Sequence, residues 1–341
     1  MPTLCLLFRR PNPNFFSIEK IFAQLCVDPA WELPTEKAYV PSPSSSLRAI
    51  LKNLWFVRRQ RADIYHVTGD IHYAVLALPS KRVLLTIHDC VFMHRSSGLK
   101  RRLFKWLFLD LPVRHCRMIT TISEATKRDI VQYTGCPPDK VIVIPNPLSG
   151  SIRFQPAAFR QHSPVILFIG VTPNKNLERV IAALQGIDCV LTIIGQPPPT
   201  MLALLERHRI RYAQRANLTE EELADQYIAS DMVLFPSVFE GFGLPVIEAQ
   251  KAGRPVITSN LSPMKEVAGQ GACLVDPYDP ASIRQAVMKI MMDKAYREEL
   301  VQAGFRNTAR FAPEKIVAQY MTCYRQLLTG TIQSPLTKLE K

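Results

Sequence analysis

Short runs of β-branched and other apolar residues alternate with amphipathic segments along most of this 341-residue chain. In the second half the runs are VILFIG (165–170), VLTIIG (190–195), MVLFPS (232–237), RPVITSN (254–260) and ACLVD (272–276). In the first half they are LCLLF (4–8), DIYHV (63–67), VLLTI (83–87), MITTIS (118–123) and VIVIP (141–145). This alternation is typical of parallel sheets with helices on both faces. The sequence therefore predicts an α/β fold with two doubly wound, Rossmann-like lobes.

The length sets how these elements divide into domains. Single cores rarely grow beyond roughly 250–300 residues, so we expect two lobes that face a cleft. The segment 145–164 is rich in Pro and Ser and has no helical period, which predicts a linker. We place an N-terminal domain at 1–155, a C-terminal domain at 156–312, and a helix over 313–330 that crosses back to the first lobe.

The formal net charge of +13 is concentrated in the first lobe, where residues 1–155 hold 22 lysines and arginines against 11 acids. Two amphipathic stretches, 47–61 and 99–117, mix these cations with aromatic residues. The aromatic residues are Trp55, Phe56, Phe104, Trp106 and Phe108. The mixture suits an anionic membrane surface, and equally two core helices with basic outer faces. No nucleic-acid motif is present, so we expect no nucleic-acid partner.

The sequence contains neither a bilayer-spanning apolar stretch nor a signal-peptide core, which predicts a cytoplasmic protein. Its eight cysteines form no C-x-x-C pair, and we expect reduced thiols.

One strand-to-helix turn contains several residues that could bind a ligand. After MVLFPS comes VFEGFGLPVIEAQKAG, with Glu240 and Glu248 on either side of a Gly-Phe-Gly-Leu-Pro turn. Gly241 and Gly243 allow a ligand to approach the backbone, and the free amides at the helix start predict an anion site. We expect Glu248 in the first helical turn, where a carboxylate can bind the vicinal diol of a ribose. Taken alone, the glycines only make a turn and Glu248 only complements the helix dipole.

This E-x7-E segment resembles the signature of retaining glycosyltransferases of family 4, which have the GT-B fold. The segments TIHD (86–89), TISEATKRDIV (121–131), VIPNP (143–147), FIGVTPNKNLERVIAAL (168–184) and LTIIG (191–195) agree in order and spacing. The resemblance covers roughly residues 65–341. It implies a donor site made by Gly170, Thr172, Lys175, Asn176, Gly241, Phe242, Gly243, Leu244 and Glu248.

The resemblance also implies how the reaction proceeds. Lys175 would neutralise the leaving diphosphate, and Glu240 would contact hydroxyls of the transferred sugar rather than act as a nucleophile. Attack would occur from the front face, with the leaving phosphate taking the acceptor's proton. Because the sequence has no D-x-D, we expect no metal and no cofactor beyond the nucleotide sugar.

The sequence departs from the family pattern at two places. Val171 stands where many relatives have a phosphate-binding arginine, and residues 1–68 contain no glycine in place of the usual glycine-rich turn. From their position we expect Arg9 and Arg10 to supply the missing cation.

In the first lobe, His88 resembles the family's catalytic cleft histidine, and Asp89 is the candidate to orient its ring. Asp70 and His72 follow another strand and are candidate acceptor contacts. They are equally explained as a helix cap and a packing residue.

These features predict transfer of a mannose- or glucose-type hexose from GDP-mannose or UDP-glucose to a lipid-linked or polysaccharide acceptor, as in lipopolysaccharide synthesis. We expect peripheral attachment to the inner face of the cell membrane. The alternatives are a sugar-nucleotide epimerase on the same fold and a catalytically silent binding protein. The sequence does not determine base, sugar, acceptor, linkage or oligomeric state.

Overall fold

A computed structural model, which describes residues 1–11, 17–95 and 97–330, divides the chain into two compact units. Unit 1 contains residues 1–147 and the chain from Pro313 onward, and unit 2 contains 148–312. The division falls within the predicted linker but ahead of residue 155. The reason is that the start of the linker already bonds to unit 2: Leu148 donates to the Phe311 carbonyl at 2.8 Å, and Arg254 donates to the Gln155 carbonyl at 3.0 Å.

Unit 1 is built on a six-stranded parallel sheet with the order β2-β1-β3-β4-β5-β6. Its strands are β1 (Leu4–Phe8), β2 (Thr35–Tyr39), β3 (Ile64–Val67), β4 (Val83–Ile87), β5 (Met118–Thr121) and β6 (Val141–Val143). Five of them were predicted. The sixth, β2, is a largely exposed edge strand without an apolar run.

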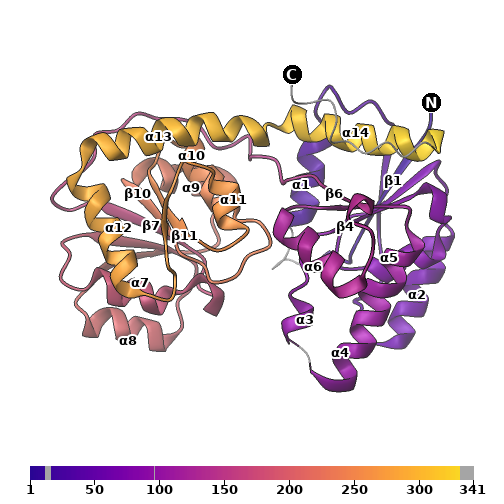
Figure 1. Cartoon of the computed structure of the whole chain (residues 1–341), viewed down its shortest axis with the longest axis horizontal. Helices are drawn as coiled ribbons and strands as arrows, with labels where there is room; N and C mark the ends of the chain where they lie inside the picture. Colours follow the sequence, from indigo (N-terminus) through magenta and orange to yellow (C-terminus); the bar gives the residue numbers. More distant parts are fainter. Residues whose placement is uncertain (12–16, 96, 331–341) are drawn as a thin grey trace. The chain divides into compact units, whose positions relative to one another are not determined.

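Helices cover both faces of this sheet (Figure 1). They are α1 (Ser17–Leu25), α2 (Leu47–Arg58), α3 (Phe92–Arg95), α4 (Gly98–Lys105), α5 (Leu111–His115), α6 (Glu124–Thr134) and α14 (Pro313–Thr329). A π-helical turn (Trp106–Asp110) joins α4 to α5, and 3-10 turns lie at His72–Ala77, Ser80–Arg82 and Pro138–Lys140. Helix α14, yellow in Figure 1, packs beside α1 in the same apolar cluster as β1.

A buried polar network ties α14 to the sheet of unit 1. His66 on β3 is fully buried, with Nδ1 2.8 Å from the Tyr324 hydroxyl and Nε2 2.7 Å from Thr86 Oγ1. Thr86 in turn lies 2.6 Å from Thr120 Oγ1 on β5. Burial lowers the pKa of His66 to about 3, so the ring is neutral.

Unit 2 has a second six-stranded parallel sheet, ordered β12-β11-β10-β7-β8-β9. Its strands are β7 (Val165–Ile169), β8 (Val190–Ile194), β9 (Arg211–Arg215), β10 (Met232–Phe235), β11 (Val256–Ser259) and β12 (Cys273–Val275). Its helices are α7 (Leu177–Leu184), α8 (Pro199–Arg207), α9 (Glu220–Ala229), α10 (Leu244–Lys251), α11 (Met264–Ala268), α12 (Pro280–Met292) and α13 (Lys294–Thr308), with 3-10 turns at Pro173–Lys175 and Ala309–Phe311. A capping box formed by Thr219 and Glu222 starts α9.

The strand orders fix where ligands can bind. In unit 2 the chain runs from β7 outward to β9 and then from β10 outward to β12, so the order reverses between β7 and β10. In unit 1 it reverses between β1 and β3. Ligands of open α/β sheets bind beyond the carboxyl ends of strands at such switch points. The loops after these four strands are therefore the candidate sites.

The two basic stretches of unit 1 bury one face and expose another. Ile50 and Val57 of α2, and Phe108 in the π-helical turn, pack in or against the core. Trp55 and Trp106 are 62% and 51% exposed. Within the described residues, no helix combines the length and apolarity needed to cross a bilayer. All eight cysteines are free thiols, six of them buried.

Candidate functional site

The loop after β7 presents a lysine at the unit 2 switch point. Gly170 follows the strand directly with φ +87°, a backbone conformation that favours glycine. A Cβ at this position would lie 2.9 Å from Lys175 Cε, so the lysine side chain lies directly over the glycine. The sequence at 170–175 thus folds into a turn that lays Lys175 across the end of β7.

Lys175 pairs with Glu240 from the loop after β10. Its Nζ lies 2.6 Å from Glu240 Oε1, and the two side chains are 18% and 14% exposed. The ammonium also lies 4.5 Å from the ring centre of Phe235, the last residue of β10. Two predicted site residues that are far apart in sequence are therefore brought together by the adjacency of β7 and β10.

Asparagines lock the two loops together. Asn174 Nδ2 donates to the Phe239 carbonyl at 2.9 Å, and its carbonyl accepts from the Val238 amide at 2.9 Å. Thr172 Oγ1 donates to Asn174 Oδ1 at 2.7 Å, so this predicted donor residue supports the loop. Asn174 was not predicted from the sequence, since nothing in NKN distinguishes its role from that of its neighbours.

Asn176 does not face the site, contrary to expectation. It is 3% exposed, and its Nδ2 donates to the carbonyls of Pro236 at 3.1 Å and Pro277 at 2.6 Å. Its Oδ1 accepts from Arg179 at 2.9 Å. Because its amide is fully occupied, Asn176 holds loops in place and is not free to contact a ligand.

The turn before α10 offers backbone amides. Gly243 takes φ +103° and Leu244 begins the helix, with Pro245 at the second position. Phe242 points inward and packs edge-on against Phe311 at 5.7 Å, so only its backbone is available. Within the described residues, the amides of 241–244 have no hydrogen-bond acceptor. Together with the amino end of α10 they offer free N–H donors to an anion, directly after Glu240, the partner of Lys175.

Glu248 lies in the second turn of α10, because the helix begins only at Leu244; the expectation of a first-turn position is wrong. Its Oε2 accepts a hydrogen bond of 2.6 Å from the hydroxyl of Tyr227 on α9. Burial raises the pKa of Glu248, and donation by Tyr227 lowers it. Tyr227 was missed in the sequence, where it looks like one more apolar position of an amphipathic helix.

At the unit 1 switch point, Arg9 is already paired. Its Nε lies 3.1 Å from Glu19 and its Nη1 lies 2.8 Å from Asp70. Two carboxylates thus neutralise the arginine that we expected to supply a phosphate cation, and Asp70, expected at an acceptor, is its partner. Arg10 is exposed. Both arginines line a cavity of about 520 Å³ with Ser42 and Asp70.

His88 follows β4 and is half-buried. Its Nε2 lies 2.8 Å from the Thr68 carbonyl, which can only accept, so Nε2 carries the proton. Burial lowers the pKa of His88, which keeps the ring neutral and leaves Nδ1 as an acceptor. Asp89 does not orient the ring as expected, because its Oδ1 accepts from the Val91 amide at 2.9 Å. The Thr68 carbonyl takes that role.

His72 belongs to the core. It is 5% exposed, and its Nδ1 lies 2.7 Å from the Phe108 carbonyl. The packing alternative, rather than an acceptor contact, therefore describes His72.

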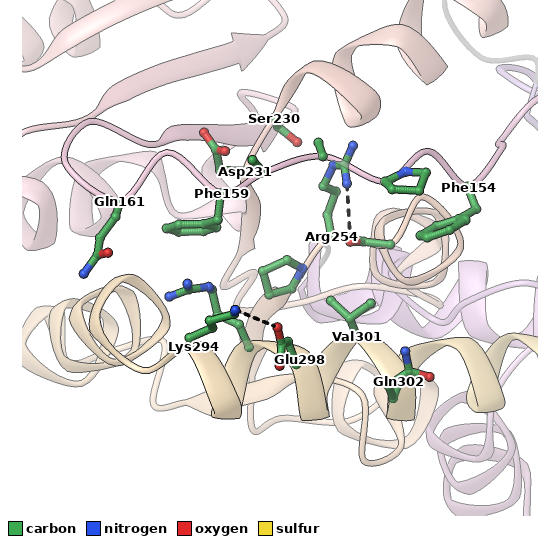
Figure 2. Close-up of a pocket in the computed structure, with 16 residues that line it drawn as sticks. Phe154, Phe159, Gln161, Ser230, Asp231, Arg254, Lys294, Glu298, Val301 and Gln302 are labelled. Atoms are coloured by element: carbon green, nitrogen blue, oxygen red, sulfur yellow. Dashed lines mark hydrogen bonds and ion pairs between the residues drawn. The ribbon is translucent and has the colours of Figure 1, made fainter.

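A cavity of about 630 Å³ lies elsewhere in unit 2, at the amino ends of β10 and β11 (Figure 2). Linker residues from Phe154 to Phe159 form one wall and α13 forms another. Arg254, 5% exposed, donates to the carbonyls of Tyr227 and Ile228 beyond this wall. None of the predicted site residues lines this cavity, which separates it from the switch-point loops.

Both units match known families. Residues 152–307 match the family described as "Glycosyl transferases group 1", and residues 12–149 match the one described as "Glycosyltransferase Family 4".

Individual relatives agree with these matches. The chain is 26% identical over 306 residues to the O-antigen chain mannosyltransferase B of Escherichia coli, covering 81% of this chain and 77% of that protein. It is 27% identical over 218 residues to the serotype-specific mannosyltransferase WbdA of Escherichia coli, covering 57% of this chain and 27% of WbdA, so it spans about a quarter of that relative. The structure of Alr3699/HepE from Anabaena in complex with UDP and glucose superposes with a TM-score of 0.76 at 15% identity, covering 95% of this chain and all of that one. The likeness to HepE is one of fold.

Proposed function

The chain belongs to the group 1, family 4 glycosyltransferases, which have the GT-B fold, and from this membership we propose that it is a retaining hexosyltransferase. Its donor would be a nucleotide-diphosphate sugar, and its acceptor a lipid-linked or polysaccharide chain. The mannosyltransferase names of the relatives favour GDP-mannose as the first donor to test, and the UDP bound to HepE makes UDP-glucose the second. The observation that carries the proposal is the Lys175–Glu240 pair beside the free amides of 241–244.

Lys175 suits a diphosphate leaving group. Cleavage of the bond to the anomeric carbon places negative charge on the phosphate, which needs a preorganised positive partner. A lysine ammonium has three N–H donors, and Glu240 accepts one of them. Lys175 can therefore donate to a phosphate oxygen while it keeps Glu240 in place for the sugar hydroxyls.

Glu248 is the proposed ribose partner. A carboxylate offers about four acceptor sites, and Tyr227 occupies one of them. The remaining sites can accept both hydroxyls of a vicinal diol.

For His88 we propose a contact with a hydroxyl of the transferred sugar. Because Nε2 is committed to Thr68, neutral Nδ1 can only accept, which suits a hydroxyl and not a phosphate oxygen.

We propose that transfer needs no divalent metal, since the sequence lacks D-x-D and Lys175 supplies a fixed cation. The test measures transfer of a radiolabelled sugar from the donor to a glycolipid acceptor, in the presence of either EDTA or Mg²⁺. Equal rates are expected, and loss of transfer in EDTA would refute metal independence.

The first experiment on function is a thermal-shift panel with GDP, UDP and ADP, because a ligand that binds only the folded chain raises its Tm. The products formed from the donor then distinguish the transferase from the two alternative functions. An epimerase converts donor without acceptor, and a silent binding protein leaves the donor intact. Acceptor-dependent release of the nucleoside diphosphate is the result expected of the transferase.

The exposed faces of α2 and α4 support a membrane partner. Leu47, Leu51 and Trp55 of α2 are 57–70% exposed and follow one another at four-residue spacing. Leu99 and Leu103 of α4 are 82% and 59% exposed. The exposed cations around them are Arg48, Lys52, Arg58, Arg59, Arg61, Lys100, Arg101 and Arg102. With no acid in residues 47–61 or 98–109, we propose that these faces bind anionic lipid at the cytoplasmic side of the membrane.

Vesicle flotation tests this partner. The chain should float with vesicles of phosphatidylcholine and phosphatidylglycerol and much less with phosphatidylcholine alone. The double variant Leu51→Glu, Trp55→Glu should lose at least about tenfold in binding, because two charges replace inserted apolar groups. Met292→Glu, an exposed apolar residue of unit 2, is the matched control and should bind as the wild type does. Equal flotation with both vesicle types would refute the proposal.

A further inference from the structure

Tyr227 lies behind the proposed ribose carboxylate and makes a single side-chain hydrogen bond. Its ring is fully buried, and its hydroxyl donates to Glu248 Oε2 at 2.6 Å. That distance is typical of a short O–H···O⁻ bond to an ionised acceptor. Burial and the neighbouring Glu248 raise the pKa of Tyr227 far above its ordinary value, so the phenol stays protonated and always donates.

Tyr227 is itself held at its backbone. Its carbonyl accepts from Arg254 Nε at 3.1 Å and from Ser230 Oγ at 2.8 Å. Arg254 is 5% exposed and anchors the carboxyl end of α9 through the Ile228 carbonyl as well. At the other end of α9, Thr219 and Glu222 form the capping box. The hydroxyl therefore has little freedom, and Glu248 must adapt to it.

From this arrangement we propose that Tyr227 is the positioning residue for Glu248: its hydroxyl selects the rotamer in which the carboxylate can bind a ribose diol. This inference rests on the proposed function of Glu248. A glutamate side chain without such a partner would rotate among several staggered conformers, and only some would direct the carboxylate toward the nucleotide. Fixing it beforehand removes that entropy cost from donor binding.

The same bond sets when Glu248 is charged. Burial has the largest effect and raises the pKa of Glu248, the hydrogen bond from Tyr227 lowers it, and the charge of Glu220, also on α9, raises it. Without the phenol the pKa of Glu248 rises further, so the carboxylate protonates at a higher pH. A chain without this phenol should therefore bind a diol less well than the wild type at acidic pH.

The test compares nucleotide binding by wild type, Tyr227→Phe and Glu248→Gln. Isothermal titration with GDP or UDP, whichever binds the wild type more tightly, is run beside its 2′-deoxy analogue. We expect Tyr227→Phe to weaken the ribonucleotide by about 2- to 12-fold, because the ligand must then order the Glu248 side chain that Tyr227 orders beforehand in the wild type. It should weaken the deoxy analogue much less, and its affinity should fall at a higher pH than that of the wild type. In the double variant the two losses should not add.

Tyr324→Phe is the matched control. It also removes a buried tyrosine hydroxyl with a 2.8 Å partner, but in unit 1. It should lower the Tm and leave the nucleotide Kd unchanged. If Tyr227→Phe binds ribo- and deoxynucleotide as the wild type does while Glu248→Gln loses the ribonucleotide, the positioning role is refuted and the ribose role of Glu248 stands. If Glu248→Gln also binds normally, or if the wild type binds no nucleotide, the proposed function fails at this site.

Discussion

Replacing Lys175 by methionine tests the central electrostatic claim. Met keeps much of the side-chain volume over Gly170 and removes the charge. A charge-assisted hydrogen bond contributes about 1.5–3 kcal/mol, so the Kd for the preferred nucleoside diphosphate should rise about 10- to 150-fold. Glu240 adds to the loss, because its carboxylate, 2.6 Å from the ammonium in the wild type, would then face the phosphate unpaired. Two like charges about 5 Å apart repel by about 3 kcal/mol at an effective dielectric constant of about 20.

Titration calorimetry with the diphosphate and with its parent nucleoside separates these contributions. Lys175→Met should lose diphosphate affinity and keep nucleoside affinity. Glu240→Gln should bind the diphosphate at least as tightly as the wild type, and adding it to Lys175→Met should restore part of the lost affinity. The reasoning is refuted if Lys175→Met binds the diphosphate within twofold of the wild type, or if the double variant is no better than the single one.

Two further predictions concern Gly170 and His66. Gly170→Ala forces a non-glycine residue to φ +87° and places a Cβ 2.9 Å from Lys175 Cε, so it should cost about 1–3 kcal/mol of stability and displace the lysine. Denaturant titration and calorimetry would check both effects, and unchanged diphosphate affinity would contradict the second. His66, whose pKa is about 3 in the folded chain against 6.5 ordinarily, binds its proton more readily when unfolded. Stability should therefore fall below pH 6.5 by up to about 1.4 kcal/mol per pH unit, and His66→Gln should show a flatter pH dependence in thermal unfolding.

The sequence predicts the strands that are built from apolar runs. Eight of these ten strands lie inside the sheets, where helices cover each face and apolar residues are needed throughout, and the other two are the apolar edge strands β6 and β12. The two that were missed, TEKAY in β2 and RYAQR in β9, are edge strands whose charged side chains reach solvent. Backbone pairing with β1 and β8 makes these two segments strands, and their amino-acid composition does not reveal that pairing.

The sequence names candidate site residues where a motif contains them, but it does not reveal the contacts that depend on the fold. The motif identifies Glu240 and Glu248, but the contact of Glu240 with Lys175 depends on β7 and β10 being neighbours. Arg9 was expected to bind phosphate from its position after β1, and Glu19 and Asp70 neutralise it instead. Tyr227 was missed because hydrophobic periodicity does not distinguish a core tyrosine whose hydroxyl binds a partner from any other buried residue of a helix.

The return of α14 to unit 1 governs the order in which the nascent chain can mature. Ile316, Tyr320 and Tyr324 complete the apolar cluster that holds Phe8, Phe22 and Trp31. They leave the ribosome after all of unit 2, so unit 2 has every residue it needs first, while the cluster of unit 1 is still only partly covered by α1. A premature stop before Pro313 should therefore leave unit 2 able to fold and unit 1 incomplete. Until α14 is synthesised, the exposed apolar cluster of unit 1 is a surface that chaperones can bind.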